Sequence, residues 1–190
     1  ESFEQLNQDV QLNKKNQLRL NGMKSEIHQR AFLSIRKLLT LVGYSDFDLA
    51  YDAFGKPHLA DHNYISITHS HHFSAIIVSN EPVGIDIEMQ REIILKIAHK
   101  FVNDDELNRL QKTDLAEYIK KLTVKWGAKE AIFKLVPDHD VEFRNQIHIS
   151  PFNPEQDDRF QVKFKSDKGD STHELQFQIF ENHCLVWVAS

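Results

Sequence analysis

Two acidic residues lie two positions apart in the segment VGIDIE at residues 83–88. Its alternating pattern predicts a β-strand on which Asp86 and Glu88 point to one face and the isoleucines point to the other. Paired carboxylates suit Mg²⁺, which usually keeps several waters and completes its shell with substrate phosphates. Taken alone, the segment is more typical of a half-buried strand with a solvated acidic face, although adjacent like charges cost energy without a nearby cation.

A second segment, WGAKEAIFK at residues 126–134, lies in a predicted helix. With about 100° between successive residues, Glu130 and Lys134 stand on the shoulder of the apolar face that carries Trp126. From there Glu130 could serve as a further metal ligand, and Lys134 could neutralise a diphosphate. Taken alone, the two residues are more typical of an i,i+4 ion pair on a helix surface, worth about 0.3–0.5 kcal/mol.

Two short loops carry groups that could contact an anion. GKP at residues 55–57 exposes Lys56 on a backbone stiffened by proline, and SITHS at residues 66–70 places Thr68 and His69 at the end of a predicted strand. Each loop alone is more often an ordinary hairpin turn or strand end. A zinc-dependent hydrolase is a further alternative, because histidines occur at positions 58, 62, 69, 71 and 72. The lack of a nearby Cys and of a regular i,i+4 His pair disfavours it.

The elements that would position these groups follow from hydrophobic periodicity. Three-to-four-residue spacing predicts helices over 23–42, 91–100 and 114–136, with another short helix starting at the Asn-Asp-Asp-Glu run at 103–106. The apolar stripe of the first helix would comprise Met23, Ile27, Ala31, Ile35, Leu38 and Val42. Short β-rich segments predict strands at 47–54, 64–68, 74–79 and 83–88, a hairpin formed by 160–165 and 175–179, and a fully buried strand at 183–189.

This order of elements predicts an α+β fold made of two similar α/β subdomains, with helices packed on antiparallel sheets. The boundary is expected just after residue 88, giving subdomains of residues 1–88 and 89–190. The first would carry the two anion-contacting loops and the paired carboxylates. The second would carry the helix with Glu130 and the C-terminal antiparallel strands.

The composition is that of an ordinary globular protein, with 190 residues, 41% hydrophobic and 27% charged, and a formal net charge of −5. A negative balance disfavours nonspecific nucleic-acid binding, which depends on neutralising phosphates. The single Cys184 excludes a disulfide within the chain and fits a reducing compartment. No apolar run is long enough for a membrane helix, and the polar first residues do not resemble a signal peptide. We therefore expect a cytoplasmic protein without membrane or nucleic-acid partners.

In this order and spacing, the segments GKP, SITHS, VGIDIE and WGAKEAIFK resemble the motifs of the 4′-phosphopantetheinyl transferase superfamily. Chain length and the two-half layout resemble the surfactin-synthetase-activating (Sfp) type more than the shorter, trimeric holo-acyl-carrier-protein synthase type. The resemblance implies a pseudo-two-fold arrangement of the two subdomains. It also implies magnesium-dependent transfer of 4′-phosphopantetheine from coenzyme A to a serine of an apo carrier protein, with release of 3′,5′-ADP.

The resemblance also assigns roles to residues. Asp86, Glu88 and Glu130 match the family's magnesium ligands, and Lys134 matches the lysine that contacts the coenzyme A diphosphate. Asp86, Glu130 and Lys134 are then the catalytic candidates, with Glu130 the first choice as the base for the carrier serine.

The nucleotide end of coenzyme A would be held by a separate set of basic and polar groups. Thr68 and His69 match the motif near the 3′-phosphate, and Lys56 matches the lysine of the GKP turn. Arg30 on the first helix is a further candidate for that phosphate.

A complete site within one chain favours a monomer that binds coenzyme A and an apo acyl or peptidyl carrier protein. Carrier proteins are generally acidic around their serine, so Lys120, Lys121 and Lys125 are candidates for docking. The alternative function is a noncatalytic module that binds coenzyme A or another 3′-phosphoadenosine ligand through the same anion contacts.

Overall fold

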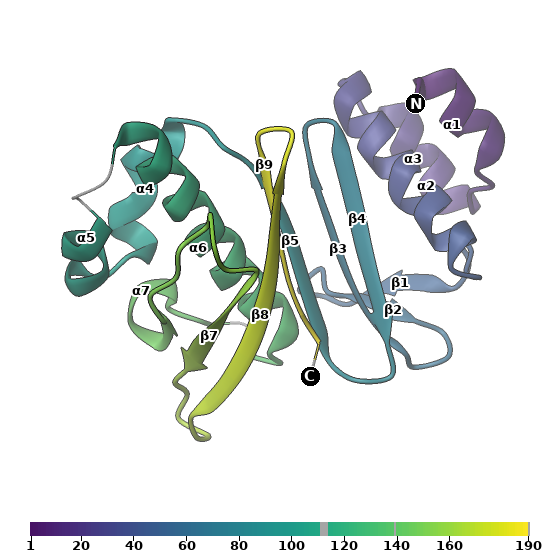
Figure 1. The fold of residues 1–190 in the computed structure, drawn as a ribbon. Coiled ribbons are helices and arrows are strands. Elements are labelled where there is room, and N and C mark those ends of the chain that lie inside the picture. The colour runs from purple at the N-terminus through teal and green to yellow at the C-terminus, as the bar shows by residue number, and fades with distance from the viewer. Residues whose placement is uncertain (111–113, 139, 190) are drawn as a thin grey trace.

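A computed structural model of the chain describes residues 1–110, 114–138 and 140–189 (Figure 1). Three helices pack together at the N-terminus: α1 (Phe3–Asp9), α2 (Lys14–Gly22) and α3 (Glu26–Leu41). Their shared core contains Leu6, Leu20, Phe32 and Leu33. The sequence predicted α3 but neither of the two short helices before it, whose few turns give little periodicity.

The buried face of α3 differs from the predicted stripe. Ile27 and Val42 are 52% and 50% exposed, whereas Phe32 and Leu33 are buried. The helix is enclosed on more than one side, by α1 and α2 on one flank and by the strand β4 on another. A single-stripe pattern describes a helix with one buried face, so it does not describe α3.

The first half of the chain contributes two small antiparallel sheets. β1 (Leu49–Tyr51) pairs with β2 (Pro57–Leu59), and β3 (Tyr64–Ser70) pairs with β4 (Phe73–Ser79). The predicted strand at 47–54 is therefore shorter than expected. Gly55 lies in the turn between β1 and β2 with a φ of 85°, a conformation that glycine adopts without steric cost. The GKP segment is thus part of a hairpin.

The second half forms a five-stranded antiparallel sheet in the order β5-β9-β8-β7-β6. The strands are β5 (Val83–Met89), β6 (Ile147–Ile149), β7 (Arg159–Phe164), β8 (Ser171–Phe180) and β9 (His183–Ala189). Its helices are α4 (Ile93–Phe101), α5 (Asp104–Leu110), α6 (Leu115–Leu135) and α7 (Phe143–Gln146). The long helix α6 lies along β5 and β9 (Figure 1).

The α+β fold with helices on antiparallel sheets is confirmed, as is the hairpin of β7 and β8. β5 pairs in register with β9, from Val83 opposite Ala189 to Met89 opposite His183. The strand before residue 88 therefore belongs by hydrogen bonding to the sheet of the second half. The division at residue 88 stays a prediction. Within the described residues, no helix combines the length and the apolar character needed to cross a membrane.

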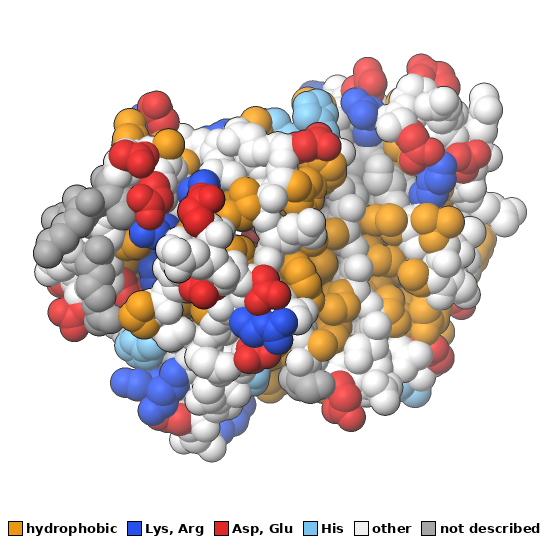
Figure 2. Space-filling view, in the orientation of Figure 1, with side chains coloured by type: hydrophobic (Ala, Val, Ile, Leu, Met, Phe, Trp, Pro, Cys, Tyr) orange, Lys and Arg blue, Asp and Glu red, His pale blue; other side chains and the backbone are white. Residues whose placement is uncertain are grey.

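The predicted basic strip is wrong at Lys125. Its side chain is only 6% exposed, and its ammonium lies 3.0 Å from Oε1 of Glu106. The other oxygen of Glu106, Oε2, lies 3.6 Å from the ammonium of the fully buried Lys129. Lys120 and Lys121 pair with Glu155 and Glu117. On the face shown in Figure 2, most Lys and Arg side chains likewise lie beside acidic ones.

Glu106→Gln is expected to lower the free energy of unfolding by about 3–5 kcal/mol, because it removes the carboxylate that two buried ammonium groups face. Urea unfolding at neutral pH measures the loss. Glu174→Gln is the matched control, since it breaks a pair with Arg159 in which both side chains are 49% exposed. That change should cost no more than about 0.5 kcal/mol. A similarly small effect in both variants would contradict the prediction.

Candidate active site

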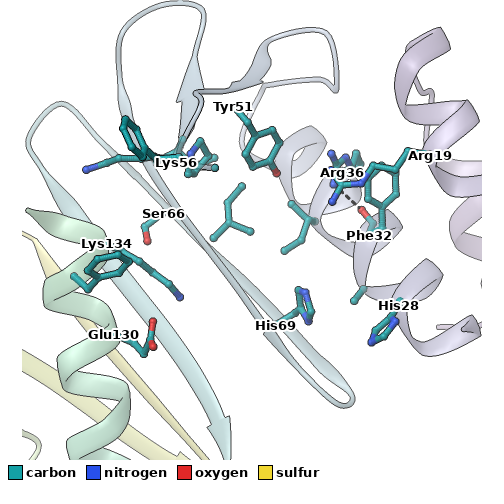
Figure 3. A pocket seen from close by; sticks show the side chains of 18 of the residues that line it. Arg19, His28, Phe32, Arg36, Tyr51, Lys56, Ser66, His69, Glu130 and Lys134 are labelled. Atoms are coloured by element: carbon teal, nitrogen blue, oxygen red, sulfur yellow. Dashed lines mark hydrogen bonds between the residues drawn. The ribbon is translucent and has the colours of Figure 1, made fainter. Parts of the chain in front are cut away.

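A cavity of about 680 Å³ lies between α3, the β1–β2 hairpin, β3 and the C-terminal part of α6 (Figure 3). Four of the predicted site residues line it: Lys56 and His69 from the first half of the chain, and Glu130 and Lys134 from α6. Segments from both halves therefore converge on one space. Its volume is within the range of small-molecule sites in proteins.

Asp86 lies beside this cavity, buried between β5 and α6. The Lys134 ammonium donates to its Oδ1 at 2.7 Å and to the Ile85 carbonyl at 2.9 Å. The Thr68 hydroxyl also donates to Oδ1, at 3.1 Å. The other oxygen, Oδ2, is buried and has no hydrogen-bond partner among the described residues. Asp86 is only 5% exposed, so the alternative of a solvated acidic strand face is wrong.

Two glycines allow α6 to lie close to the sheet, Gly84 at the contact with β5 and Gly127 at the contact with β9. A Cβ atom at Gly84 would stand 1.9 Å from the backbone oxygen of Ala131, and one at Gly127 would stand 3.0 Å from Cγ2 of Val186. The Gly127 position is also 3.7 Å from Asp86 Oδ2. Close packing at these two points brings the Glu130 turn of the helix beside the carboxylates of β5.

Two further carboxylates share this region, and both have a raised pKa. Burial raises the pKa of Glu130 to about 7, with smaller contributions from the charges of Asp86 and Glu88, while Lys134 opposes the shift. Burial and the Asp86 charge also raise the pKa of Glu88, whose Oε1 accepts a hydrogen bond from the Trp126 indole at 3.2 Å. Burial likewise raises the pKa of Asp86 against the opposing charge of Lys134.

The charge of the cluster fits a divalent cation. Three carboxylates lie near the Lys134 ammonium, and the Arg91 charge also acts on Glu88. Burial is the main cause of their raised pKa values, and repulsion between carboxylates adds to it for Glu88 and Glu130. The buried Oδ2 of Asp86, which has no hydrogen-bond partner within the described ranges, could serve as an oxygen ligand. In the described part of the chain, no three His, Cys, Asp or Glu side chains are gathered closely enough to hold an ion. The three-ligand magnesium set thus stays a prediction.

The predicted nucleotide contacts divide into two pairs. Lys56 lines the cavity and donates to the Val136 carbonyl at 3.2 Å, with its pKa lowered by burial. His69 also lines it, and burial, followed by the charges of His28 and Lys134, lowers its pKa.

The other pair does not reach the cavity. Thr68 is 6% exposed and points to Asp86 beneath it, because it stands on the side of β3 that faces β5. Arg30 is turned toward the N-terminus, where it donates to the Glu1 carbonyl at 3.0 Å. Neither residue is among those that line the cavity.

Several cavity-lining residues escaped the sequence analysis. The basic ones are Arg19, His28 and Arg36, and aromatic ones include Tyr51, Phe54 and Phe133. Arg36 is 3% exposed, stacks on Phe32 and bonds Asp46 at 3.0 Å. His28 and Arg36 lie on α3, Arg19 on α2, and Tyr51 and Phe54 in the β1–β2 hairpin, and none of these five belongs to a noted motif. Only Phe133, directly before Lys134 in a noted segment, carried a local signal.

The raised pKa of Glu130 predicts that the metal-free protein loses stability as the pH rises from about 4.5 to about 7. In this range the folded state retains a proton on Glu130 that the unfolded state has released, so raising the pH favours unfolding. Glu130→Gln removes this titration. The free energy of unfolding of the variant, minus that of wild type, should therefore rise by up to about 3 kcal/mol between pH 4.5 and pH 8.

Urea unfolding in EDTA at the two pH values measures this difference. Glu81→Gln, at an exposed position outside the cluster, should show no such relative gain. Parallel pH dependence in wild type and Glu130→Gln would show that Glu130 is not the titrating group.

The fold and the site together define an α+β protein with an acidic, lysine-paired centre beside a ligand-sized cavity. The chain belongs to the 4′-phosphopantetheinyl transferase superfamily, whose family model matches residues 82–188. This match covers more than half of the chain and contains both VGIDIE and WGAKEAIFK. The predicted family resemblance is confirmed.

Curated relatives include the 4′-phosphopantetheinyl transferase gsp of Aneurinibacillus migulanus, 34% identical over 44% of this chain and 35% of that protein. The 4′-phosphopantetheinyl transferase Sfp of Bacillus subtilis (strain 168) is 30% identical over 47% of this chain and 41% of that protein. The matches thus span well under half of these relatives. A crystal structure of a holo-(acyl-carrier-protein) synthase from Bacillus anthracis str. Ames, in complex with CoA (3′,5′-ADP), aligns with a TM-score of 0.41 and 17% identity. That alignment covers 56% of this chain and 92% of that chain.

Proposed function

We propose that this protein transfers 4′-phosphopantetheine from coenzyme A to a serine of an apo carrier protein, in a magnesium-dependent reaction that releases 3′,5′-ADP. The observation that carries the proposal is the buried Asp86 beside a cavity of about 680 Å³, with one oxygen held by Lys134 and the other without a hydrogen-bond partner among the residues that the structure describes. Membership of the superfamily supports the choice of reaction.

The cavity is lined by groups that suit both ends of such a substrate. Lys56, His69 and Arg19 line it on the side of the first half, where they would face the nucleotide phosphate. Apolar groups such as Ile65 and Ile67 also line it. Glu130 and Lys134 would then lie at the diphosphate, where the bond to be broken is located.

Once the substrate is positioned in the cavity, the protein must neutralise charge on the diphosphate and accept the proton of the attacking serine. Mg²⁺ held by Asp86, Glu88 and Glu130 would act as a Lewis acid toward the diphosphate oxygens. Lys134 would place its ammonium against the same charge, since it already lies at the carboxylate cluster.

The serine oxygen of the carrier forms a new bond to phosphorus, and the bond from that phosphorus to 3′,5′-ADP breaks. The serine proton would pass to Glu130; its pKa of about 7 belongs to the metal-free site, and a bound cation would favour the ionised form that accepts a proton. Because both halves of the site come from one chain, we expect a monomer to suffice.

Mass spectrometry of an apo acyl carrier protein and an apo peptidyl carrier domain, each incubated with this protein, coenzyme A and Mg²⁺, tests the proposal. At least one carrier should gain one phosphopantetheine group, and EDTA should abolish the gain. Coenzyme A binding that persists in EDTA, with no transfer to either carrier, would instead identify a noncatalytic coenzyme A-binding module.

A further inference from the structure

Three hydroxyl groups of β3 lie in a row against the edge of β5. Ser66, Thr68 and Ser70 alternate along β3 and so point to the same side of the strand. Their oxygens accept hydrogen bonds from successive outward backbone N–H groups of β5: Ile85 to Ser66 at 3.1 Å, Ile87 to Thr68 at 3.1 Å and Met89 to Ser70 at 3.3 Å. The row supplies β5 with the acceptors that a neighbouring strand would otherwise provide.

Thr68 differs from the two serines in one respect. Its hydroxyl accepts from the Ile87 N–H and donates to Oδ1 of Asp86, both at 3.1 Å. Lys134 donates to the same carboxylate oxygen at 2.7 Å. Both donors therefore act on Oδ1, and Oδ2 is left buried with no partner among the described residues.

Two donors on one oxygen fix the rotation of a carboxylate. The donors also differ in rigidity, because Lys134 reaches Asp86 through a long, flexible side chain that must turn toward the diphosphate in the proposed reaction. Thr68 is β-branched, has a restricted χ1 angle and is anchored by its bond to the Ile87 N–H. When Lys134 turns away, Thr68 still holds Oδ1.

We propose that Thr68 is a positioning residue that orients Asp86 so that Oδ2 faces the metal, and that it does not contact the nucleotide. The proposal rests on the proposed function, because it concerns the same metal site. Groups that orient metal ligands in this way commonly contribute about 10- to 100-fold to metal affinity. The same hydroxyl links the β3–β4 sheet to the metal site, so the first half of the chain helps to set the geometry of the second.

Binding of Mn²⁺, followed by EPR with coenzyme A present and no carrier protein, tests this role without turnover. Thr68→Val keeps the shape of the side chain and removes both hydrogen bonds, so it should weaken Mn²⁺ binding about tenfold or more. Ser70→Ala is the matched control, because it also leaves a β5 N–H without its acceptor but touches no carboxylate. It should change the Mn²⁺ affinity less than about twofold, and Thr68→Ser should restore most of the affinity.

Three results would overturn the role of Thr68. One is that Thr68→Val binds Mn²⁺ as tightly as wild type. Another is that Thr68→Val and Ser70→Ala weaken binding equally, which would indicate a general effect on the contact between β3 and β5. Wild type that binds coenzyme A but not Mn²⁺ would contradict the magnesium dependence as well. If Thr68→Val does not fold, Thr68→Ala is compared with Ser70→Ala, and equal affinities of these two would reject the role.

Discussion

Asp86→Asn is expected to reduce the rate of phosphopantetheine transfer by about 10³-fold or more, within the range for losing a principal charge-stabilising group in phosphoryl transfer. The asparagine retains an oxygen that can accept from Thr68 and Lys134. It also places an amide N–H where the carboxylate had an unpartnered oxygen, and it removes one negative charge. A divalent cation therefore loses both a ligand and part of its attraction.

The same substitution should not unfold the protein. Burial raises the pKa of Asp86, so the ionised carboxylate is unfavourable in the metal-free folded state. We expect Asp86→Asn to be at least as stable as wild type at pH 8 in EDTA, because the amide has no charged form to bury. Loss of activity together with retained stability would separate a chemical role of Asp86 from a structural one.

Initial rates of holo-carrier formation, followed by mass spectrometry at saturating coenzyme A and Mg²⁺, measure the effect. Asp158→Asn is the control, because Asp158 pairs with Arg159 on the surface and its side chain is 75% exposed. It should leave the rate unchanged. A rate for Asp86→Asn within tenfold of wild type would reject the metal role of this residue.

Gly84→Ala is expected to lower the stability of the protein strongly. The added Cβ would stand 1.9 Å from the oxygen of Ala131 and 2.9 Å from its carbonyl carbon, both backbone atoms of α6. A helix backbone cannot move aside as a flexible side chain can, so α6 or β5 must shift. We expect a loss of about 3 kcal/mol or more in the free energy of unfolding, at the upper end for overpacked cores.

The shift should also impair the site, because α6 carries Glu130 and Lys134 while β5 carries Asp86. Urea unfolding measures the stability, and transfer assays on the folded fraction measure the activity. Gly22→Ala is the matched control: a Cβ at Gly22 meets nothing within 4 Å, and its φ is not in the left-handed region. That variant should be unchanged or more stable by up to about 1 kcal/mol. Equal stability of the two variants would contradict the predicted clash.

Local patterns in the sequence predicted most of the elements that carry the site. Period-two alternation indicated β5, β7 and β8, and the three-to-four-residue spacing indicated α3 and α6. These predictions succeeded because each element has enough residues for its period to be visible. The two N-terminal helices, with seven and nine residues, were missed for the opposite reason.

Periodicity gave less information about which polar side chains are buried. Lys125 was expected on a docking surface, but it lies against Glu106 inside the protein. The i,i+4 spacing of Glu130 and Lys134 suggested a surface pair, whereas Lys134 reaches across to Asp86 on β5. An ion pair between distant segments depends on how the elements pack, so no local spacing indicates it.

Two short segments of the sequence contain Asp86, Glu88, Glu130 and Lys134. The types and spacing of these residues indicated the kind of chemistry and the family. Their convergence is a property of the packed structure, since Gly84 lets α6 lie against β5, a strand about forty positions earlier in the chain, and Gly127 lets it lie against β9. Packing also points Thr68 at Asp86 and brings Arg19 and Arg36, but not Arg30, to the cavity. Short segments define side-chain chemistry, but the direction in which each group points depends on neighbours distant in sequence.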